Sequence, residues 1–160
     1  MESKKLNIGI DASRNRSGGA IAHLKGIINT LDSSPDDVNK IHIWAPDYLI
    51  KQLHSKEWLV FHRSRFINSK SIIIQLLWQL FIFHRVAKRY EIDIVLNTDA
   101  GSVGRFLPAV TMSRDMLSFE EGEMQRFNKS IKYLRLLILK YVQIKSLKKS
   151  SGVIFLTKYA

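Results

Sequence analysis

A glycine pair that follows two arginines is the first pattern in the chain suited to binding a ligand. Gly18 and Gly19 come after a polar segment holding Arg14 and Arg16, and an apolar helical repeat follows them. Glycines let a backbone approach a ligand closely, and free N–H groups at a helix N-terminus attract phosphate. We interpret this loop as a candidate phosphate site; the alternative is a tight strand-to-helix turn that binds no ligand. Neither G-x-G-x-x-G nor the P-loop pattern occurs, which disfavours NAD-dependent dehydrogenases and P-loop enzymes.

A second candidate is the tripeptide Ser113-Arg114-Asp115, which ends a short apolar run. An arginine can clamp an anion or sugar hydroxyls, and an aspartate can accept hydrogen bonds from hydroxyls or act as a base. The alternative is an Arg–Asp pair that closes a surface loop. Weaker candidates, of types that commonly cap loops or form turns, stand at the ends of other apolar runs: Asp11, Asn97 and Asp99.

The residue types argue against metal and cysteine chemistry. The chain has no cysteine, which excludes a disulfide scaffold, a thiolate zinc site, an iron–sulfur cluster and a cysteine nucleophile. The histidines are scattered without the H-E-x-x-H spacing, and G-x-S-x-G is absent. We expect no metal, no cofactor and no Ser–His hydrolase, and we interpret five histidines as surface or partly buried side chains: His23, His42, His54, His62 and His84.

Apolar runs that alternate with helical repeats must position these candidates. Strands are expected at 6–11, 41–45, 58–62, 92–97, 108–113 and 152–157, and helices after the glycine pair to about 31, after Pro46 to about 54, and over 71–90 and 129–149. This alternation predicts an α/β fold with a mostly parallel sheet and helices on both faces. Ligands of such sheets bind beyond the carboxyl ends of the strands, so the site is expected in four loops: 11–19, 97–104, 113–123 and 157–160.

The positive charge is concentrated towards the C-terminus. The 160 residues hold 25 Lys and Arg against 14 Asp and Glu, a net charge of +11. Nine of the basic residues and none of the acidic ones follow Glu123, so the last 37 residues carry +9 and the first 123 only +2. A hydrophobic content of 46% excludes a disordered basic tail. We therefore expect one folded domain with an anionic partner: phosphate, nucleic acid or a membrane surface.

The predicted helix at 129–149 is both basic and apolar. This composition predicts a surface that rests on anionic lipid; the alternative is a core helix whose solvated face is basic. Nucleic-acid binding is disfavoured, because no RNP-like strand, helix-turn-helix or GXXG pattern occurs. The N-terminus is unlike a signal peptide, and the apolar stretch 72–83 spans 12 residues where a membrane-spanning helix needs about 20. We expect a cytoplasmic protein, soluble or peripheral on the inner face of the membrane.

The order of these segments resembles the N-terminal domain of GT-B glycosyltransferases, in particular the retaining family 4 enzymes of bacterial surface-polysaccharide assembly. The resemblance covers nearly the whole chain, from IGIDASRNRSGG through IVLNTDAG to SSGVIFLTKYA. Its most specific piece is MSRDMLSFE, which is similar to the family's MSRNMLPFE, with Asp115 in place of Asn and Ser118 in place of Pro. The resemblance implies a Rossmann-like domain over 1–160 that forms one half of a two-domain enzyme.

The resemblance also implies roles in the transfer of a hexose from a nucleotide-sugar to a cell-surface polysaccharide or lipid-linked acceptor. Gly18 and Gly19 would approach the donor diphosphate, and Arg114 and Asp115 would be catalytic residues beside the transferred sugar or the acceptor hydroxyl. Four further residues would bind the acceptor: Arg14, Arg16, Asn97 and Glu120. The family rests on the inner membrane, which suits the basic helix, and no nucleic acid is expected as a partner.

The family's second domain grips the nucleotide and carries paired glutamates in the pattern E-x7-E, which has no counterpart in this sequence. We therefore expect an N-terminal fragment without transferase activity of its own. Two other hypotheses stay open. One is a stand-alone basic module for anionic membrane or nucleic acid. The other is a nucleotide-binding domain of another class, which the absent dinucleotide fingerprint disfavours.

Overall fold

Strands and helices alternate along the chain. The computed structural model describes residues 4–16, 18–114, 118–120, 122, 125–127 and 130–156. The strands are β1 (Leu6–Asp11), β2 (Val38–Trp44), β3 (Leu59–His62), β4 (Ile94–Asn97), β5 (Ala109–Ser113) and β6 (Gly152–Phe155). The helices are α1 (Gly18–Thr30), α2 (Asp47–Ile50), α3 (Ile72–Leu77), α4 (Phe83–Arg89) and α5 (Ile131–Lys149), with a π-helical segment at Trp78–Ile82 and a 3-10 turn at Gln125–Phe127.

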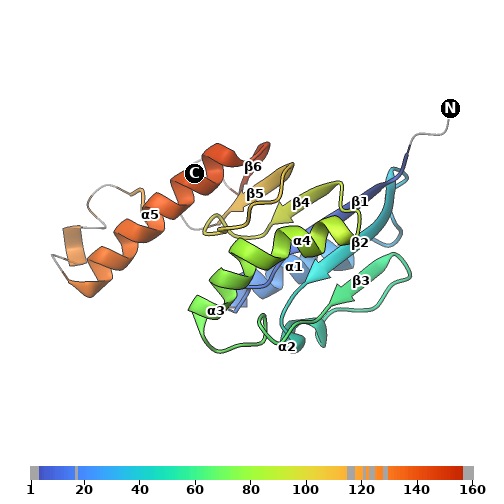
Figure 1. The fold of residues 1–160 in the computed structure, drawn as a ribbon, viewed down its shortest axis with the longest axis horizontal. Coiled ribbons are helices and arrows are strands. Elements are labelled where there is room, and N and C mark those ends of the chain that lie inside the picture. The colour runs from blue at the N-terminus through green and yellow to red at the C-terminus, as the bar shows by residue number, and fades with distance from the viewer. Residues whose placement is uncertain are drawn as a thin grey trace.

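The strands form one parallel sheet of six strands in the order β3-β2-β1-β4-β5-β6 (Figure 1). The chain builds outward from β1 to β3 and then returns to the other side of β1 to add β4, β5 and β6. The strand order therefore reverses between β1 and β4, which end together, because Asp11 pairs with Asn97 in the register. The predicted α/β fold with a parallel sheet is confirmed, and it is Rossmann-like.

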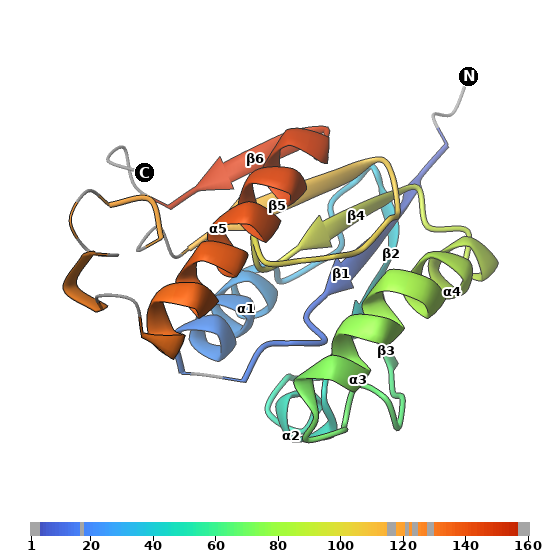
Figure 2. The same cartoon turned by 60° about the vertical axis from the view of Figure 1, so that its left-hand side comes forward.

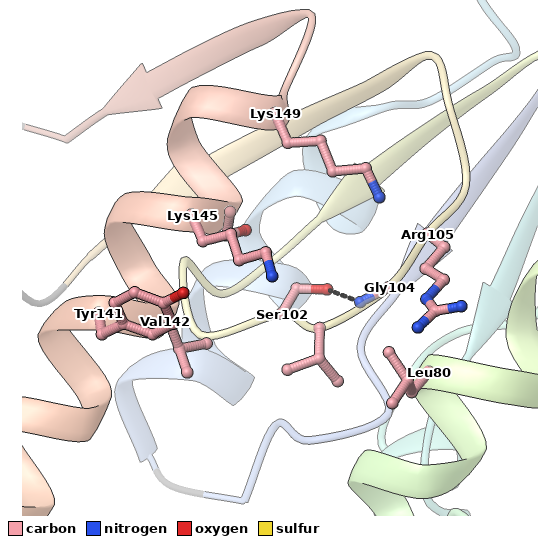
Figure 3. A pocket seen from close by; sticks show the side chains of 10 residues that line it. Leu80, Ser102, Gly104, Arg105, Tyr141, Val142, Lys145 and Lys149 are labelled. Carbon is pink, nitrogen blue, oxygen red and sulfur yellow. Dashed lines mark hydrogen bonds between the residues drawn. The ribbon is translucent and has the colours of Figure 1, made fainter.

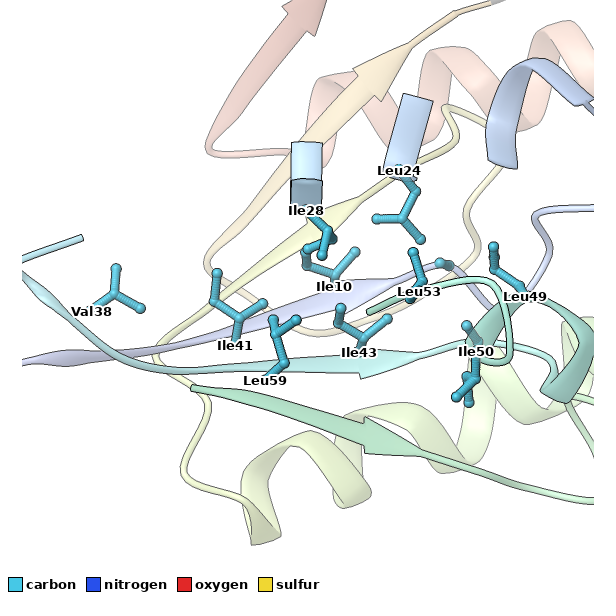
Figure 4. Packing of buried hydrophobic residues seen from close by; sticks show 12 residues of the cluster. Ile10, Leu24, Ile28, Val38, Ile41, Ile43, Leu49, Ile50, Leu53 and Leu59 are labelled. Carbon is cyan, nitrogen blue, oxygen red and sulfur yellow. The ribbon is translucent and has the colours of Figure 1, made fainter. Parts of the chain in front are cut away.

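Each face of the sheet has its own apolar core, because successive side chains of a strand point to opposite faces. On one face, strand residues such as Ile10 and Ile43 pack against Leu24 of α1 and Leu49 of α2 (Figure 4). On the other face, a second cluster lies under α3 and α4 and includes Trp44, Trp78, Phe83 and Val95. Figure 2 shows α5 beside this second face as well. Helices on both faces, as predicted, cover strands that are apolar on both sides.

The helix predicted at 71–90 runs from Ile72 to Arg89 and contains one π-helical segment, which its sequence does not reveal. Its two glutamines are buried: Gln75 is 2% exposed and Gln79 is 3% exposed. Gln75 Nε2 donates to the carbonyl oxygens of Ile67 (2.8 Å) and Ser69 (2.9 Å). Among the described helices, none combines the length and the apolar composition needed to cross a membrane.

The basic helix α5 is the least buried long element of the fold. Its N-cap residue Ser130 accepts a hydrogen bond from the Tyr133 amide. Among the described residues of α5, Gln143 alone is buried, and its Oε1 accepts from Ser118 Oγ at 2.6 Å. The apolar side chains Ile131 and Leu134 are 88% and 58% exposed. The described part of α5 therefore exposes both apolar and basic side chains.

Candidate ligand site at the carboxyl edge of the sheet

The loops that follow β1 and β4 meet where the strand order reverses. Asp11 ends β1 and Asn97 ends β4 as its partner in the register. Open α/β sheets bind ligands beyond such a reversal, since the loops on its two sides leave in opposite directions. The residues around this edge therefore define the candidate site, where the sequence placed two of its expected loops.

Asp11 is the buried anchor of this edge, at 3% exposure. Its Oδ1 accepts from the backbone N (3.1 Å) and Oγ (2.6 Å) of Ser13, and its Oδ2 accepts from Gln79 Nε2 (2.6 Å). Burial raises the pKa of Asp11 above the ordinary 3.8, and the hydrogen bonds from Ser13 and Gln79 act in the opposite direction. Because both carboxylate oxygens are occupied, Asp11 caps its loop.

Three polar residues that the sequence patterns did not single out join the two loops: Asn15, Gln79 and Thr98. The Thr98 hydroxyl donates to the Asp11 carbonyl at 2.9 Å and lies 3.0 Å from Asn15 Oδ1. Gln79 Oε1 accepts from the Val103 amide at 3.3 Å, so Gln79 links both loops to the π-helical segment. The sequence does contain a clue to Gln79, because it is a glutamine inside an apolar helical stretch. A buried amide needs a polar partner, so such a position indicates a hydrogen bond to another part of the chain.

Arg14 reaches from the β1 loop to the β4 loop. Its Nη1 donates to the Gly101 carbonyl at 2.5 Å, and its Nη2 lies 3.7 Å from Asp99 Oδ2. The Arg14 side chain is 16% exposed, and its Nε is buried without a hydrogen-bond partner among the described residues. Asp99 also accepts from the Gly101 amide at 2.9 Å, as a turn residue does. Arg14 therefore holds the two loops together, and its contact with an acceptor stays a prediction.

Arg16 points to a different part of the edge. Its guanidinium donates to the carbonyl oxygens of Ser69 (2.7 Å) and Lys70 (3.2 Å), ahead of α3. It borders a cavity of about 340 Å³ that Tyr48 and Gln75 also line. Gln75 Oε1 is buried there without a hydrogen-bond partner in the described part of the chain. The two arginines of the glycine loop therefore do not form one cluster.

Gly18 and Gly19 begin α1 and are exposed. A Cβ atom added at either position would meet no atom within 4 Å, so packing does not require glycine there. The first turn of α1 holds no acidic residue, and the N–H groups of a first turn lack partners within the helix. The result is an open, electropositive helix end that can accept an anion.

Asn97 lies inside the edge rather than on it, at 8% exposure. Its Nδ2 donates to Thr111 Oγ1 at 3.0 Å, and its Oδ1 accepts from Ser102 Oγ at 3.3 Å. These bonds tie β4 to β5 and to the following loop. The predicted contact of Asn97 with an acceptor stays a prediction, but its polar atoms already have partners in the protein.

The predicted catalytic pair lies only partly within the described structure. Arg114 follows β5 on the same edge; it is half-buried, and its Nε is buried without a hydrogen-bond partner among the described residues. Asp115 lies outside the described residues. Glu120 is exposed. The structure thus gives Arg14 and Asn97 separate partners within the protein and leaves Gly18, Gly19 and Glu120 exposed to solvent.

Two of the scattered histidines form a pair that their spacing does not reveal. His42 Nδ1 and His62 Nε2 are 2.8 Å apart, and the Trp44 ring stacks on His62 with centroids 4.5 Å apart. Burial lowers the pKa of both, that of His62 from 6.5 to about 4 with a further contribution from the neighbouring His42. Within the described ranges, no three His, Asp or Glu side chains are grouped closely enough to hold a metal ion.

Comparison with known proteins does not assign the chain to a family. No protein-family model matches the chain, and no curated protein matches it.

Proposed function

We propose that this chain is the acceptor-side half of a retaining glycosyltransferase that uses a nucleotide-sugar donor. The observation that carries the proposal is the open Gly18–Gly19 end of α1 beside the β1–β4 reversal. Glycines at a helix N-terminus allow a diphosphate to approach backbone N–H groups closely. The reversal is also where open α/β sheets bind their ligands.

The proposed transfer assigns a role to each part of the edge. The bond between the anomeric carbon and the donor diphosphate breaks, and a bond to the acceptor oxygen forms with retention of configuration. The diphosphate leaves beside Gly18 and Gly19, and the acceptor's hydroxyl proton passes to a base, for which Asp115 is our candidate. Arg114, which precedes Asp115 in the chain, would stabilise the negative charge that develops beside the transferred sugar. The donor nucleotide itself would be gripped by a second domain, and the acceptor is a cell-surface glycan or a lipid-linked sugar.

The four acceptor residues divide by exposure. Arg16 and Glu120 are exposed and would contact the acceptor directly, although the Arg16 guanidinium also donates to the carbonyl oxygens of Ser69 and Lys70. Arg14 and Asn97 are less exposed and bond within the protein, so they would act as positioning residues that shape the loops.

The gene beyond codon 160 provides the first test. A continuous reading frame with a second strand–helix alternation and an E-x7-E pattern would support the proposal. An intact gene without them would contradict it. The isolated chain should show little or no binding of UDP- or GDP-sugars by calorimetry, because the nucleotide pocket would belong to the second domain.

Glycine variants of the full-length protein provide the second test. Gly18→Ala or Gly19→Ala should reduce sugar transfer about tenfold or more, because the added methyl group displaces the diphosphate. Gly26→Ala is the matched control, since it adds the same atom to the same helix with nothing within 4 Å. All three variants should fold equally well. Equal transfer rates in the three would rule out a diphosphate at the glycine pair.

A second candidate function, a basic module for anionic membranes, is favoured by the surface of α5. The helix exposes Ile138 (57%) and Tyr141 (65%) besides Ile131 and Leu134, and it carries six basic and no acidic residues: Lys132, Arg135, Lys140, Lys145, Lys148 and Lys149. Basic helices with exposed apolar residues bind anionic lipid surfaces.

Vesicle co-sedimentation tests this second function. The chain should bind anionic vesicles and not neutral ones, and binding should weaken as salt is added. The double variant Leu134→Ser, Ile138→Ser should bind more weakly. Ile73→Ser, Leu77→Ser is the control, because these side chains are 65% and 50% exposed on α3, which carries no basic residue. A role for α5 would be contradicted if binding did not change with salt concentration. It would also be contradicted if the α5 double variant and the α3 control reduced binding equally.

A further inference from the structure

A groove lies on the sheet face that carries α5, because the connection from β4 to β5 contains no helix. Residues 98–108 make this connection as an irregular loop, whereas parallel strands are usually joined through a helix. The loop leaves a cavity of about 240 Å³ beside the C-terminal half of α5. Figure 3 shows Leu80 of the π-helical segment on one side of this cavity and Tyr141 and Val142 of α5 on the other.

Three cationic side chains line this groove from two directions (Figure 3). Lys145 and Lys149 are four residues apart on α5, which places them on one face of the helix. Arg105 comes from the opposite loop, and its guanidinium packs over the Phe81 ring at 5.7 Å from the centroid. Among the described residues, no acidic side chain lines the cavity, and none of the three cations forms an ion pair.

The surroundings of the groove are also positive. A neighbouring cavity of about 260 Å³ shares Arg105 and is lined by His84 and Arg85. The pKa of His84 is lowered, first by burial and then by the charges of three cations: Lys88, Arg85 and Lys149. The part of this lowering that comes from the three cations agrees with a positive potential at this place.

We propose that this groove binds the phosphate group of a small phosphorylated ligand. The planar guanidinium of Arg105 matches two phosphate oxygens, and Lys145 and Lys149 would neutralise the remaining charge. The carbon part of the ligand would contact the apolar side chains that line the same cavity, Val103 and Val142. A cavity of about 240 Å³ accommodates one phosphate with a small organic group rather than a nucleic-acid chain.

The groove is separate from the glycine pair. Gly18 and Gly19 begin α1, which packs against the opposite core of the sheet. The proposed phosphate site therefore does not depend on the proposed glycosyltransferase activity, and either can fail while the other stands.

Titration with inorganic phosphate and pyrophosphate, followed by NMR of the labelled chain, tests the proposal. Amide shifts should cluster at 102–105 and 141–149. The double variant Lys145→Gln, Lys149→Gln should weaken the affinity for pyrophosphate about tenfold or more, because hydrogen bonds to charged groups are lost.

Lys148→Gln is the matched control, because Lys148 is an exposed lysine on the same helix that does not line the cavity. At physiological salt the affinity of Lys148→Gln for pyrophosphate should stay within about twofold, since salt screens an exposed charge that does not contact the ligand. Equal weakening in all variants, or shifts located elsewhere, would overturn the proposal.

A second arm identifies the source of the phosphate. Vesicles of phosphatidylcholine with phosphatidic acid present the same group on a lipid headgroup. Binding of free pyrophosphate without binding to these vesicles would indicate a soluble ligand. Binding to these vesicles alone, lost in Lys145→Gln, Lys149→Gln and kept in Lys148→Gln, would indicate a lipid phosphate. Binding in neither arm would refute the site.

Discussion

The two halves of the sheet bury their apolar residues very differently. In the N-terminal half, formed by β1, β2, β3, α1 and α2, side chains such as Ile28, Ile43 and Leu49 are 0% exposed. In the C-terminal half, formed by β5, β6 and α5, the edge strand leaves Ile154 and Phe155 40% and 45% exposed. Strand pattern alone therefore does not tell how well a strand is covered.

The polar groups of the two halves differ in the same way. Lys56 in the N-terminal half donates to the carbonyl oxygens of Ile28 (3.1 Å) and Leu31, next to the end of α1. The basic residues of α5 in the C-terminal half form no ion pairs within the described chain. Apolar burial is therefore deepest in the N-terminal half, whereas α5 in the C-terminal half carries six basic residues without ion pairs among the described residues. Four predictions test this division.

The largest expected effect is the loss of a core isoleucine. Ile43→Ala should lower the free energy of unfolding by about 2–5 kcal/mol, because it leaves a cavity in a packed core. Ile154→Ala, the same change on β6, should cost about 1 kcal/mol or less. Urea denaturation of both variants measures the difference. Similar losses at the two positions would show that β6 is packed as tightly as β2.

A glycine replacement is expected to have the next largest effect. A Cβ atom at Gly9 of β1 would lie 3.0–3.2 Å from the side chains of Ile92, Trp44 and Val95, so Gly9→Ala should cost about 1–3 kcal/mol. At Gly152 of β6 the nearest atom, in Val110, is 3.6 Å away, and Gly152→Ala should change the free energy of unfolding by less than about 0.5 kcal/mol. Thermal denaturation compares the two; an unchanged melting temperature for Gly9→Ala would contradict the close packing.

Acidification should destabilise the N-terminal half through its histidine pair. The pKa of His62 falls from 6.5 in the unfolded chain to about 4 in the folded one, so the unfolded state binds more protons in this range. Stability is therefore complete above pH 6.5 and is lost as the pH falls towards 4. We expect a loss of about 1–2 kcal/mol, reduced by solvent screening of the half-buried ring.

The pH dependence of unfolding in His42→Gln, His62→Gln isolates this effect. The comparison also cancels Asp11, whose raised pKa contributes in the opposite direction in both proteins. The double variant should lose the slope between pH 6.5 and 4. The control His54→Gln replaces an exposed histidine and should keep the wild-type slope. A slope that persists in the double variant would exclude the pair as its source.

The smallest expected effect concerns lysines. Lys56→Gln should cost about 0.5–1 kcal/mol, because carbonyl groups near the end of α1 lose a charged donor. Lys148→Gln on α5 should leave the free energy of unfolding unchanged, since Lys148 is exposed. Chemical denaturation resolves this difference if both variants are measured together. Equal stability of the two would show that the Lys56 contacts do not contribute.

The strands and helices were predictable because their apolar periodicities are local. The six expected strands and the long helices form at the expected places. The helix expected from Pro46 to about 54 is shorter and ends at Ile50. Among the strands the largest shift is at β2, which begins at Val38 because Val38 continues the pairing with Leu6 on β1. Such an extension depends on pairing with a neighbouring strand, and the local sequence pattern gives no information about that pairing.

The loops that form the candidate site could be predicted from the sequence, but the side-chain contacts within it mostly could not. The reversal between β1 and β4 brings the expected loops together. The roles of Asn15 and Thr98 depend on an 83-residue separation in sequence, which spacing rules do not cover. Gln79 depends on the π-helical segment that presents it to Asp11. The catalytic and binding roles of the predicted site residues remain predictions.

The α/β class, the approximate position of each strand and the concentration of charge after Glu123 follow from the sequence alone, because composition and periodicity are properties of short segments. The contacts between polar groups follow from the tertiary structure. It paired His42 with His62, placed Arg14 across from Asp99, and left Arg105 facing Lys145 and Lys149. These contacts join residues that the sheet brings together from distant parts of the chain, so the order of the strands decides them.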